Sequence, residues 1–197
     1  CENNNSKLLH ISTDYVYEGN LLIKYKENDM TAPINNYGKS KLLGDIICQQ
    51  NNPSSIILRT SWLYSSFGDN FVKKMISLMK NNKLIQVVDD QFGSPTYAFD
   101  LANFILNLIK KKKWKPGIYH YTNKGKTSWF DFANQIKLMC RYNIKIEPIS
   151  SEKFSQKAKR PKYSLLDNSK IIDTFDITQI NYIDSLRNCI KIIQNES

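Results

Sequence analysis

Apolar residues recur with two different periods along this chain. Apolar-rich runs of strand length occur at residues 7–12, 55–62, 84–88, 118–122, 145–149 and 163–166. Between them, apolar residues recur at helical spacing over residues 37–50, 70–80, 97–111, 128–141 and 181–194. In the first of these helices, one side carries Leu42, Leu43, Ile46 and Ile47. Strands that alternate with helices predict an α/β fold with a largely parallel sheet.

Signals for helix ends support two of these elements. Ser128 and Asp131 have the spacing of a capping box, which predicts that a helix starts there. The lysine run 110–113 follows an apolar-periodic segment and precedes a Pro-Gly pair. We interpret this run as a helix C-terminus whose charges complement the helix dipole, not as a nucleic-acid patch.

Composition narrows the class of protein further. A chain of 197 residues with 41% apolar residues can bury a core, which excludes a disordered or collagen-like chain. Four dispersed cysteines without a C-x-x-C pair predict reduced thiols and a cytoplasmic location, and two histidines are too few for a His-rich metal site. No apolar run approaches the ~20 residues of a membrane span. The net charge of +10 is spread over the whole chain, which disfavours a nucleic-acid partner.

Tyr37 and Lys41 form the first candidate for chemistry. They lie four residues apart at the start of a predicted helix, so both side chains share one face. A nearby ammonium lowers the pKa of a phenol, which can then pass its proton to a carbonyl oxygen while a hydride reaches the carbon. By composition, chance alone expects roughly 1.3 such pairs in this chain, so the pair needs support from its context.

The end of the first strand supplies that context. Hydroxyls and a carboxylate follow it directly in the segment 12–17, where a parallel sheet presents its ligand crevice. Strand end and helix start are therefore expected to face one cleft, with the Thr13 hydroxyl close to the carbonyl oxygen that Tyr37 protonates. The alternative for Thr13 is an ordinary turn residue at a strand end.

A series of sequence blocks then resembles one enzyme family. The segments 10–17 and 33–44 resemble the active-site half of the extended short-chain dehydrogenase/reductases, and dTDP-4-dehydrorhamnose reductases in particular. The resemblance continues through residues 59–64, 70–73, 90–96, 117–120, 128–133 and 160–164. It implies the NADPH- or NADH-dependent reduction of dTDP-4-dehydro-6-deoxy-L-mannose to dTDP-L-rhamnose, a step in making surface polysaccharide.

The same resemblance implies roles for seven residues. Tyr37 matches the proton donor, and Lys41 matches the lysine that binds the nicotinamide ribose. Thr13 matches the hydroxyl that tunes the tyrosine. Ile11 matches a residue beside the cofactor. Substrate contacts are implied for Thr13, Asp14, Trp62 and Arg160. The alternative is a core aromatic for Trp62 and a loop anchor for Arg160. A homodimer of the complete protein and a bridging Mg²⁺ enter only through the resemblance, and no residue here maps onto a metal ligand.

One part of the family pattern is absent. The seven glycines show no G-x-x-G-x-x-G spacing, which is the turn that holds a dinucleotide pyrophosphate. We therefore expect a fragment of a reductase, which on its own neither binds NADPH tightly nor turns over. The expected fold is the C-terminal part of a Rossmann-like doubly wound parallel sheet plus a smaller α/β substrate-binding region. We assign residues 1–115 to the first part and 116–197 mainly to the second, with interleaved elements.

Three other functions stay open at this point. A non-catalytic regulatory subunit can use the same fold, although the intact Thr13, Tyr37 and Lys41 argue against it. Another nucleotide-sugar epimerase or dehydratase shares the Tyr-x-x-x-Lys spacing, although dehydratases add acidic residues beside the threonine. A basic nucleic-acid-binding protein is disfavoured by the dispersed charge.

Overall fold

The computed structural model describes residues 1–4, 6–20, 22–154 and 158–195. Its helices are the 3-10 helices η1 (Glu2–Asn4) and η2 (Asp14–Val16), and α1 (Asn36–Asn51), α2 (Phe71–Asn81), α3 (Ala98–Lys110), α4 (Trp129–Cys140), α5 (Ser169–Phe175) and α6 (Tyr182–Asn195). Its longer strands are β1 (Leu9–Thr13), β2 (Ile56–Thr60), β4 (Leu84–Val88), β7 (Gly117–His120) and β9 (Lys145–Ile149). Two-residue strands are β3 (Leu63–Tyr64), β5 (Phe92–Gly93), β6 (Thr96–Tyr97), β8 (Thr127–Ser128) and β10 (Tyr163–Ser164).

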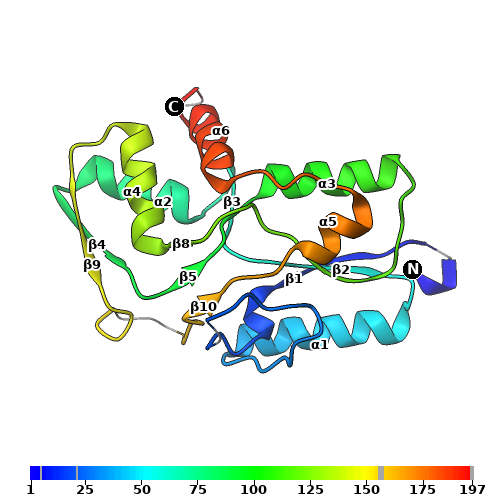
Figure 1. The fold of residues 1–197 in the computed structure, drawn as a ribbon. Coiled ribbons are helices and arrows are strands. Elements are labelled where there is room, and N and C mark those ends of the chain that lie inside the picture. The colour runs from blue at the N-terminus through cyan, green and yellow to red at the C-terminus, as the bar shows by residue number, and fades with distance from the viewer. Residues whose placement is uncertain (5, 21, 155–157, 196–197) are drawn as a thin grey trace.

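A parallel sheet in the order β1-β2-β7 forms the first layer (Figure 1). Helix α1 covers one face of this sheet, and α3 and α5 cover the other. The second face buries Ile56, Leu58 and Tyr119 of the strands against Leu101 and Phe104 of α3, together with Phe175 of α5. Helices on both faces of a parallel sheet confirm the predicted α/β fold.

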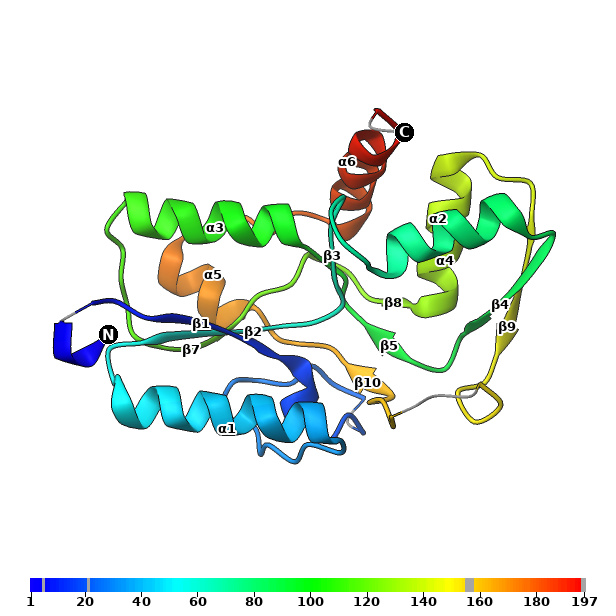
Figure 2. The ribbon, with the colours of Figure 1, turned by 180° about the vertical axis from the view of Figure 1, so that it is seen from behind.

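A second core lies beside the sheet. Strands β4 and β9 pair in parallel, helices α2 and α4 pack next to them, and α6 packs against α4 (Figure 2). The centre of this core is formed by Val72 of α2, Phe132 and Ile136 of α4, and Leu186 and Ile190 of α6, all buried. The short pairs β3–β6 and β10–β5 are also parallel, whereas β5–β8 is antiparallel.

The two cores draw on interleaved parts of the chain. Strand β7 lies in the first sheet and helix α5 packs against it, although both elements follow residue 115. Helix α2 and strand β4 contribute to the second core, although both elements precede residue 115. A division of the chain at residue 115 stays a prediction.

Helix α1 leaves most of its apolar side exposed. On its apolar side, Leu43, Ile46 and Ile47 are 57%, 42% and 48% exposed. The buried residues of this helix are instead Gly38 and Asp45. Asp45 forms a buried ion pair with Arg59 of β2, and Leu42 packs against the buried cluster that contains Val16 and Tyr17, so α1 is held by both polar and apolar contacts.

The two predicted helix ends are confirmed. Ser128 is the N-cap of α4, and its hydroxyl accepts a hydrogen bond from the Asp131 amide at 3.0 Å. Helix α3 ends at Lys110, and Lys112 adopts a left-handed φ of 50°. Among the described residues, none of the helices combines the length and the apolar character needed to cross a membrane.

Candidate functional site

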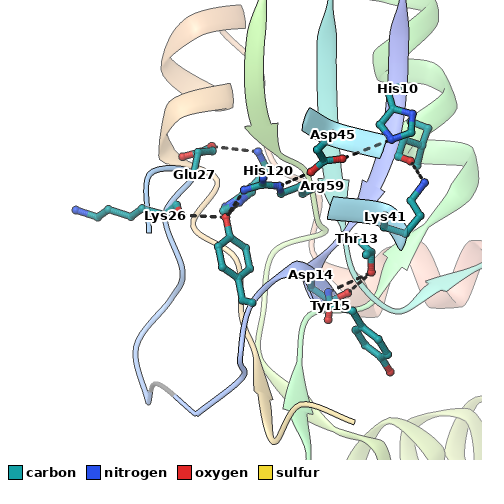
Figure 3. Close-up of polar contacts among 12 residues, drawn as sticks. His10, Thr13, Asp14, Tyr15, Lys26, Glu27, Lys41, Asp45, Arg59 and His120 are labelled. Atoms are coloured by element: carbon teal, nitrogen blue, oxygen red, sulfur yellow. Dashed lines mark hydrogen bonds and ion pairs between the residues drawn. The ribbon is translucent and has the colours of Figure 1, made fainter. Parts of the chain in front are cut away.

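A buried polar network attaches α1 to the sheet (Figure 3). Arg59 of β2 donates from Nε to Asp45 Oδ2 of α1 at 3.0 Å, and from Nη1 to the Tyr17 hydroxyl at 2.8 Å. That hydroxyl also lies 2.7 Å from His120 Nε2 of β7. Burial, followed by the charge of Arg59, lowers the pKa of His120 to about 3, so the imidazole is neutral at pH 7. The network therefore joins α1, two strands and the segment after β1.

Lys41 lies one helical turn before Asp45, on the same side of α1. Its Nζ donates to the backbone oxygen of Ile11 at 2.6 Å. Burial and the charge of Lys41 both lower the pKa of His10, which lies 3.4 Å from Asp45 Oδ1. In Figure 3 the Lys41 ammonium points at β1, close to the strand end that carries Thr13. An ammonium has three donors, so two remain for a ligand beside this edge.

The start of α1 lies unusually close to the segment after β1. A Cβ on Gly38 would lie 2.2 Å from the backbone oxygen of Tyr15, so only glycine permits this approach. The preceding residue, Tyr37, is 56% exposed, and its ring meets that of Tyr15 edge-on at a centroid distance of 5.7 Å. The Tyr37 phenol is therefore accessible to a ligand.

Thr13 and Asp14 form a buried pair at the end of β1. The Thr13 hydroxyl accepts a hydrogen bond from the Tyr15 amide at 3.2 Å and donates to Asp14 Oδ1 at 3.0 Å. Burial raises the pKa of Asp14 to about 7, although hydrogen bonds from Ser164 and Thr13 oppose the shift. Burial, with the charge of Asp14, also raises the pKa of Tyr15 to about 12. Asp14 is thus a carboxyl that changes its charge near neutral pH.

Trp62 and Trp129 lie against each other where the two cores meet. The rings of Trp62 and Trp129 are stacked, with centroids 3.5 Å apart and an interplanar angle of 6°. Trp62 has a left-handed φ of 48°, which is rare for a residue with a side chain. A Cβ on Gly93 would lie 2.5 Å from Trp62 Cε2, so this glycine makes room for the indole. Trp62 follows β2 and Trp129 begins α4, so the stack joins the two cores.

All seven residues that the sequence singled out line one cavity of about 460 Å³. They are Ile11, Thr13, Asp14, Tyr37, Lys41, Trp62 and Arg160. Two come from β1, one from η2, two from α1 and one from the turn after β2, and Arg160 comes from the segment before β10. The chemical roles of these residues stay predictions.

Comparison with protein families and known structures adds an independent observation. The family model described as RmlD substrate binding domain matches residues 1–195. The chain belongs to this family. It is 40% identical over 195 residues to the dTDP-4-dehydrorhamnose reductase of Aggregatibacter actinomycetemcomitans, covering 93% of this chain and 66% of that protein.

Solved structures of the RmlD family have the same fold. A crystal structure of a dTDP-4-dehydrorhamnose reductase from Clostridium acetobutylicum superposes with a TM-score of 0.92 at 39% identity, covering 98% of this chain and 68% of that one. A Bacillus anthracis dTDP-4-dehydrorhamnose reductase in complex with NADP superposes with a TM-score of 0.91 at 38% identity, covering 97% of this chain and 67% of that one. The chain spans slightly less than two thirds of the curated relatives, at 66%, 64% and 65% of their lengths.

Ser12 and Tyr15, in the segment that the sequence placed at the crevice, also line this cavity. Sequence reasoning did not single out four further lining residues of the RmlD-family chain, which are Thr60, Ser61, Leu63 and Trp129. Thr60 and Ser61 carry hydroxyls at the end of the second strand, so the rule that singled out the end of the first strand applies to them as well. The same rule does not predict Trp129, because this residue begins a helix of the other core and does not follow a strand of the first sheet.

No group of three or more His, Cys, Asp or Glu side chains able to hold a metal ion occurs in the described part of the chain.

Proposed function

We propose that this cavity is the active site of an NAD(P)H-dependent reductase. Its reaction reduces the 4-keto group of dTDP-4-dehydro-6-deoxy-L-mannose to a hydroxyl, giving dTDP-L-rhamnose. The observation that carries the proposal is the meeting of Tyr37, Lys41 and Thr13 around one cavity. The relatives named as dTDP-4-dehydrorhamnose reductases support the choice of substrate.

Tyr37 is the proposed proton donor. Its exposed phenol gives a proton to the carbonyl oxygen of the sugar, and the resulting phenolate is stabilised by the Lys41 ammonium on the same helix face. Thr13 donates to Asp14 in the free protein, so its hydroxyl reaches the carbonyl only when it releases that bond. Protonation of Asp14 favours the release, because a neutral carboxyl can donate to Thr13 instead.

The remaining candidates hold the nucleotide sugar. The Trp62 indole provides an apolar wall for the deoxysugar ring. The exposed guanidinium of Arg160 at the edge of the cavity suits a diphosphate, which it can bind through two parallel hydrogen bonds. Asp14 accepts hydrogen bonds from sugar hydroxyls when it is ionised.

Three residues suit a nicotinamide cofactor. Lys41 keeps free donors for ribose hydroxyls, and Ile11 and Tyr37 line the cavity beside it. The cofactor, when bound, supplies the hydride. We propose NADPH before NADH, because the Bacillus anthracis relative binds NADP.

A Tyr37→Phe variant tests the proposal. The chain is joined to the part of the Clostridium acetobutylicum reductase that it does not span, and oxidation of NADPH is followed with the keto sugar. Loss of a general acid lowers kcat by roughly 100-fold to 10,000-fold. Tyr142→Phe, a tyrosine packed against the second core, is the matched control and keeps full activity. Unchanged turnover in the Tyr37 variant would overturn the assignment.

A further inference from the structure

Asn35 makes two contacts with one side-chain amide. Its Oδ1 accepts a hydrogen bond from the Gly38 amide at 2.8 Å, which makes it the N-cap of α1. Its Nδ2 donates to the backbone oxygen of Lys159 at 2.9 Å. The two contacts join segments that are 124 positions apart in the sequence. One amide therefore ties the start of α1 to the segment before β10.

Each end of this tether carries a residue of the candidate site. Tyr37 follows Asn35 by two positions, and Arg160 directly follows Lys159. A second cavity of about 430 Å³ is lined by Asn35, Lys159 and their neighbours. It shares Tyr15, Tyr37 and Arg160 with the larger cavity, so the two cavities adjoin and the tether lines the smaller one.

We propose that Asn35 is a positioning residue that fixes the separation between the Tyr37 phenol and the Arg160 guanidinium. A nucleotide sugar whose diphosphate is bound by Arg160 then presents its keto group to Tyr37. This inference rests on the proposed function of the cavity.

The chemistry of the side chain explains why asparagine is suited to this position. The cap needs an acceptor, and the carbonyl of Lys159 needs a donor. Asparagine offers both on one planar group. Aspartate keeps the acceptor without the donor. Serine caps well but is too short to reach both partners.

Three variants separate the two contacts: Asn35→Asp, Asn35→Ser and Asn35→Ala. The 197-residue chain is measured by thermal unfolding, by amide hydrogen exchange over residues 158–165, and by calorimetric titration with dTDP. Asn35→Asp and Asn35→Ser keep the cap, so their Tm stays close to that of the parent, whereas Asn35→Ala lowers it. All three lose the hydrogen bond to the Lys159 oxygen, so exchange over 158–165 accelerates and the Kd for dTDP rises roughly threefold to tenfold, the range expected for one hydrogen bond.

The serine variant also controls for the charge that aspartate introduces beside Lys159. Parent-like exchange and dTDP affinity in Asn35→Ser, with a lower Tm in Asn35→Ala alone, would mean that Asn35 is only a helix cap, and would overturn the inference. If the parent chain does not bind dTDP, the proposed function fails at this cavity. Hydrogen exchange then decides the tether by itself.

Discussion

Asp14 combines burial with a position on the wall of the cavity. Asp14 is 3% exposed, and its Oδ1 accepts a hydrogen bond from the Thr13 hydroxyl at 3.0 Å. Removal from water disfavours the charged form, which is why its pKa rises to about 7 despite these hydrogen bonds. Charge at this point of the cavity therefore depends on pH in the range where enzymes work.

This shift predicts a specific pH dependence of stability. The unfolded chain loses the Asp14 proton near its ordinary pKa of 3.8, whereas the folded chain keeps it until about pH 7. The folded state binds more protons between these values, so the free energy of unfolding falls as pH rises from about 4 to 7 and levels off above. Urea unfolding of the parent and of Asp14→Asn should show a difference in the free energy of unfolding that changes by roughly 3–4 kcal/mol over this range. A difference independent of pH would contradict the shift.

At the scale of elements, α1 depends on polar contacts with the sheet. The Asp45–Arg59 pair is buried, with both side chains at most 3% exposed. Gly38 permits a close approach at one end of the helix, and Asn35 caps it. The orientation of Tyr37 and Lys41 therefore depends on an ion pair that lies one helical turn beyond Lys41 and about two turns beyond Tyr37.

Breaking that pair should cost much more than replacing it. Asp45→Leu leaves the Arg59 guanidinium buried without its partner, and we expect a loss of about 3–5 kcal/mol in the free energy of unfolding. The double variant Asp45→Leu/Arg59→Met removes both charges and should recover most of this loss. Urea titrations of the single and double variants measure the difference. If the single and the double variant lose the same free energy of unfolding, the loss comes from packing and not from an uncompensated charge.

At the scale of the whole molecule, β1 is an open edge of the sheet. Within the described ranges it pairs with β2 alone, and Leu43, Ile46 and Ile47 of α1 are exposed nearby. The seven glycines lack the spacing of a dinucleotide-binding turn. The ribose-binding candidates are thus present without a recognisable pyrophosphate site.

We therefore expect the 197-residue chain to bind NADPH weakly. Backbone amides of a glycine-rich turn normally hold the pyrophosphate, and Lys41 alone replaces little of that contribution. Titration of NADPH fluorescence should show no saturation at micromolar concentrations, while the fusion used to test Tyr37 saturates. Tight binding by the chain alone would contradict this expectation.

The five predicted long helices and the six predicted strands all correspond to observed elements, because the spacing and length of apolar runs are local signals. The sequence did not reveal α5 or the two-residue strands β3, β5, β6 and β8, whereas β10 lies within the predicted strand 163–166. Such short elements form through contacts with distant parts of the chain, as β5 does between β8 and β10. The apolar residues of α1 predicted a helix, but their spacing does not show that three of them are exposed to solvent.

By itself, the sequence determined the alternation of strands and helices, the capped start of α4, and the types of residue available for chemistry. Local spacing carries this information, since it depends on neighbours within one or two turns. Only the tertiary structure decided that Arg160 and Trp129 share a cavity with Tyr37, that Asp14 is buried enough to shift its pKa, and that Asn35 joins α1 to Lys159. These properties depend on residues far apart in the chain, which are brought together only when the two cores pack.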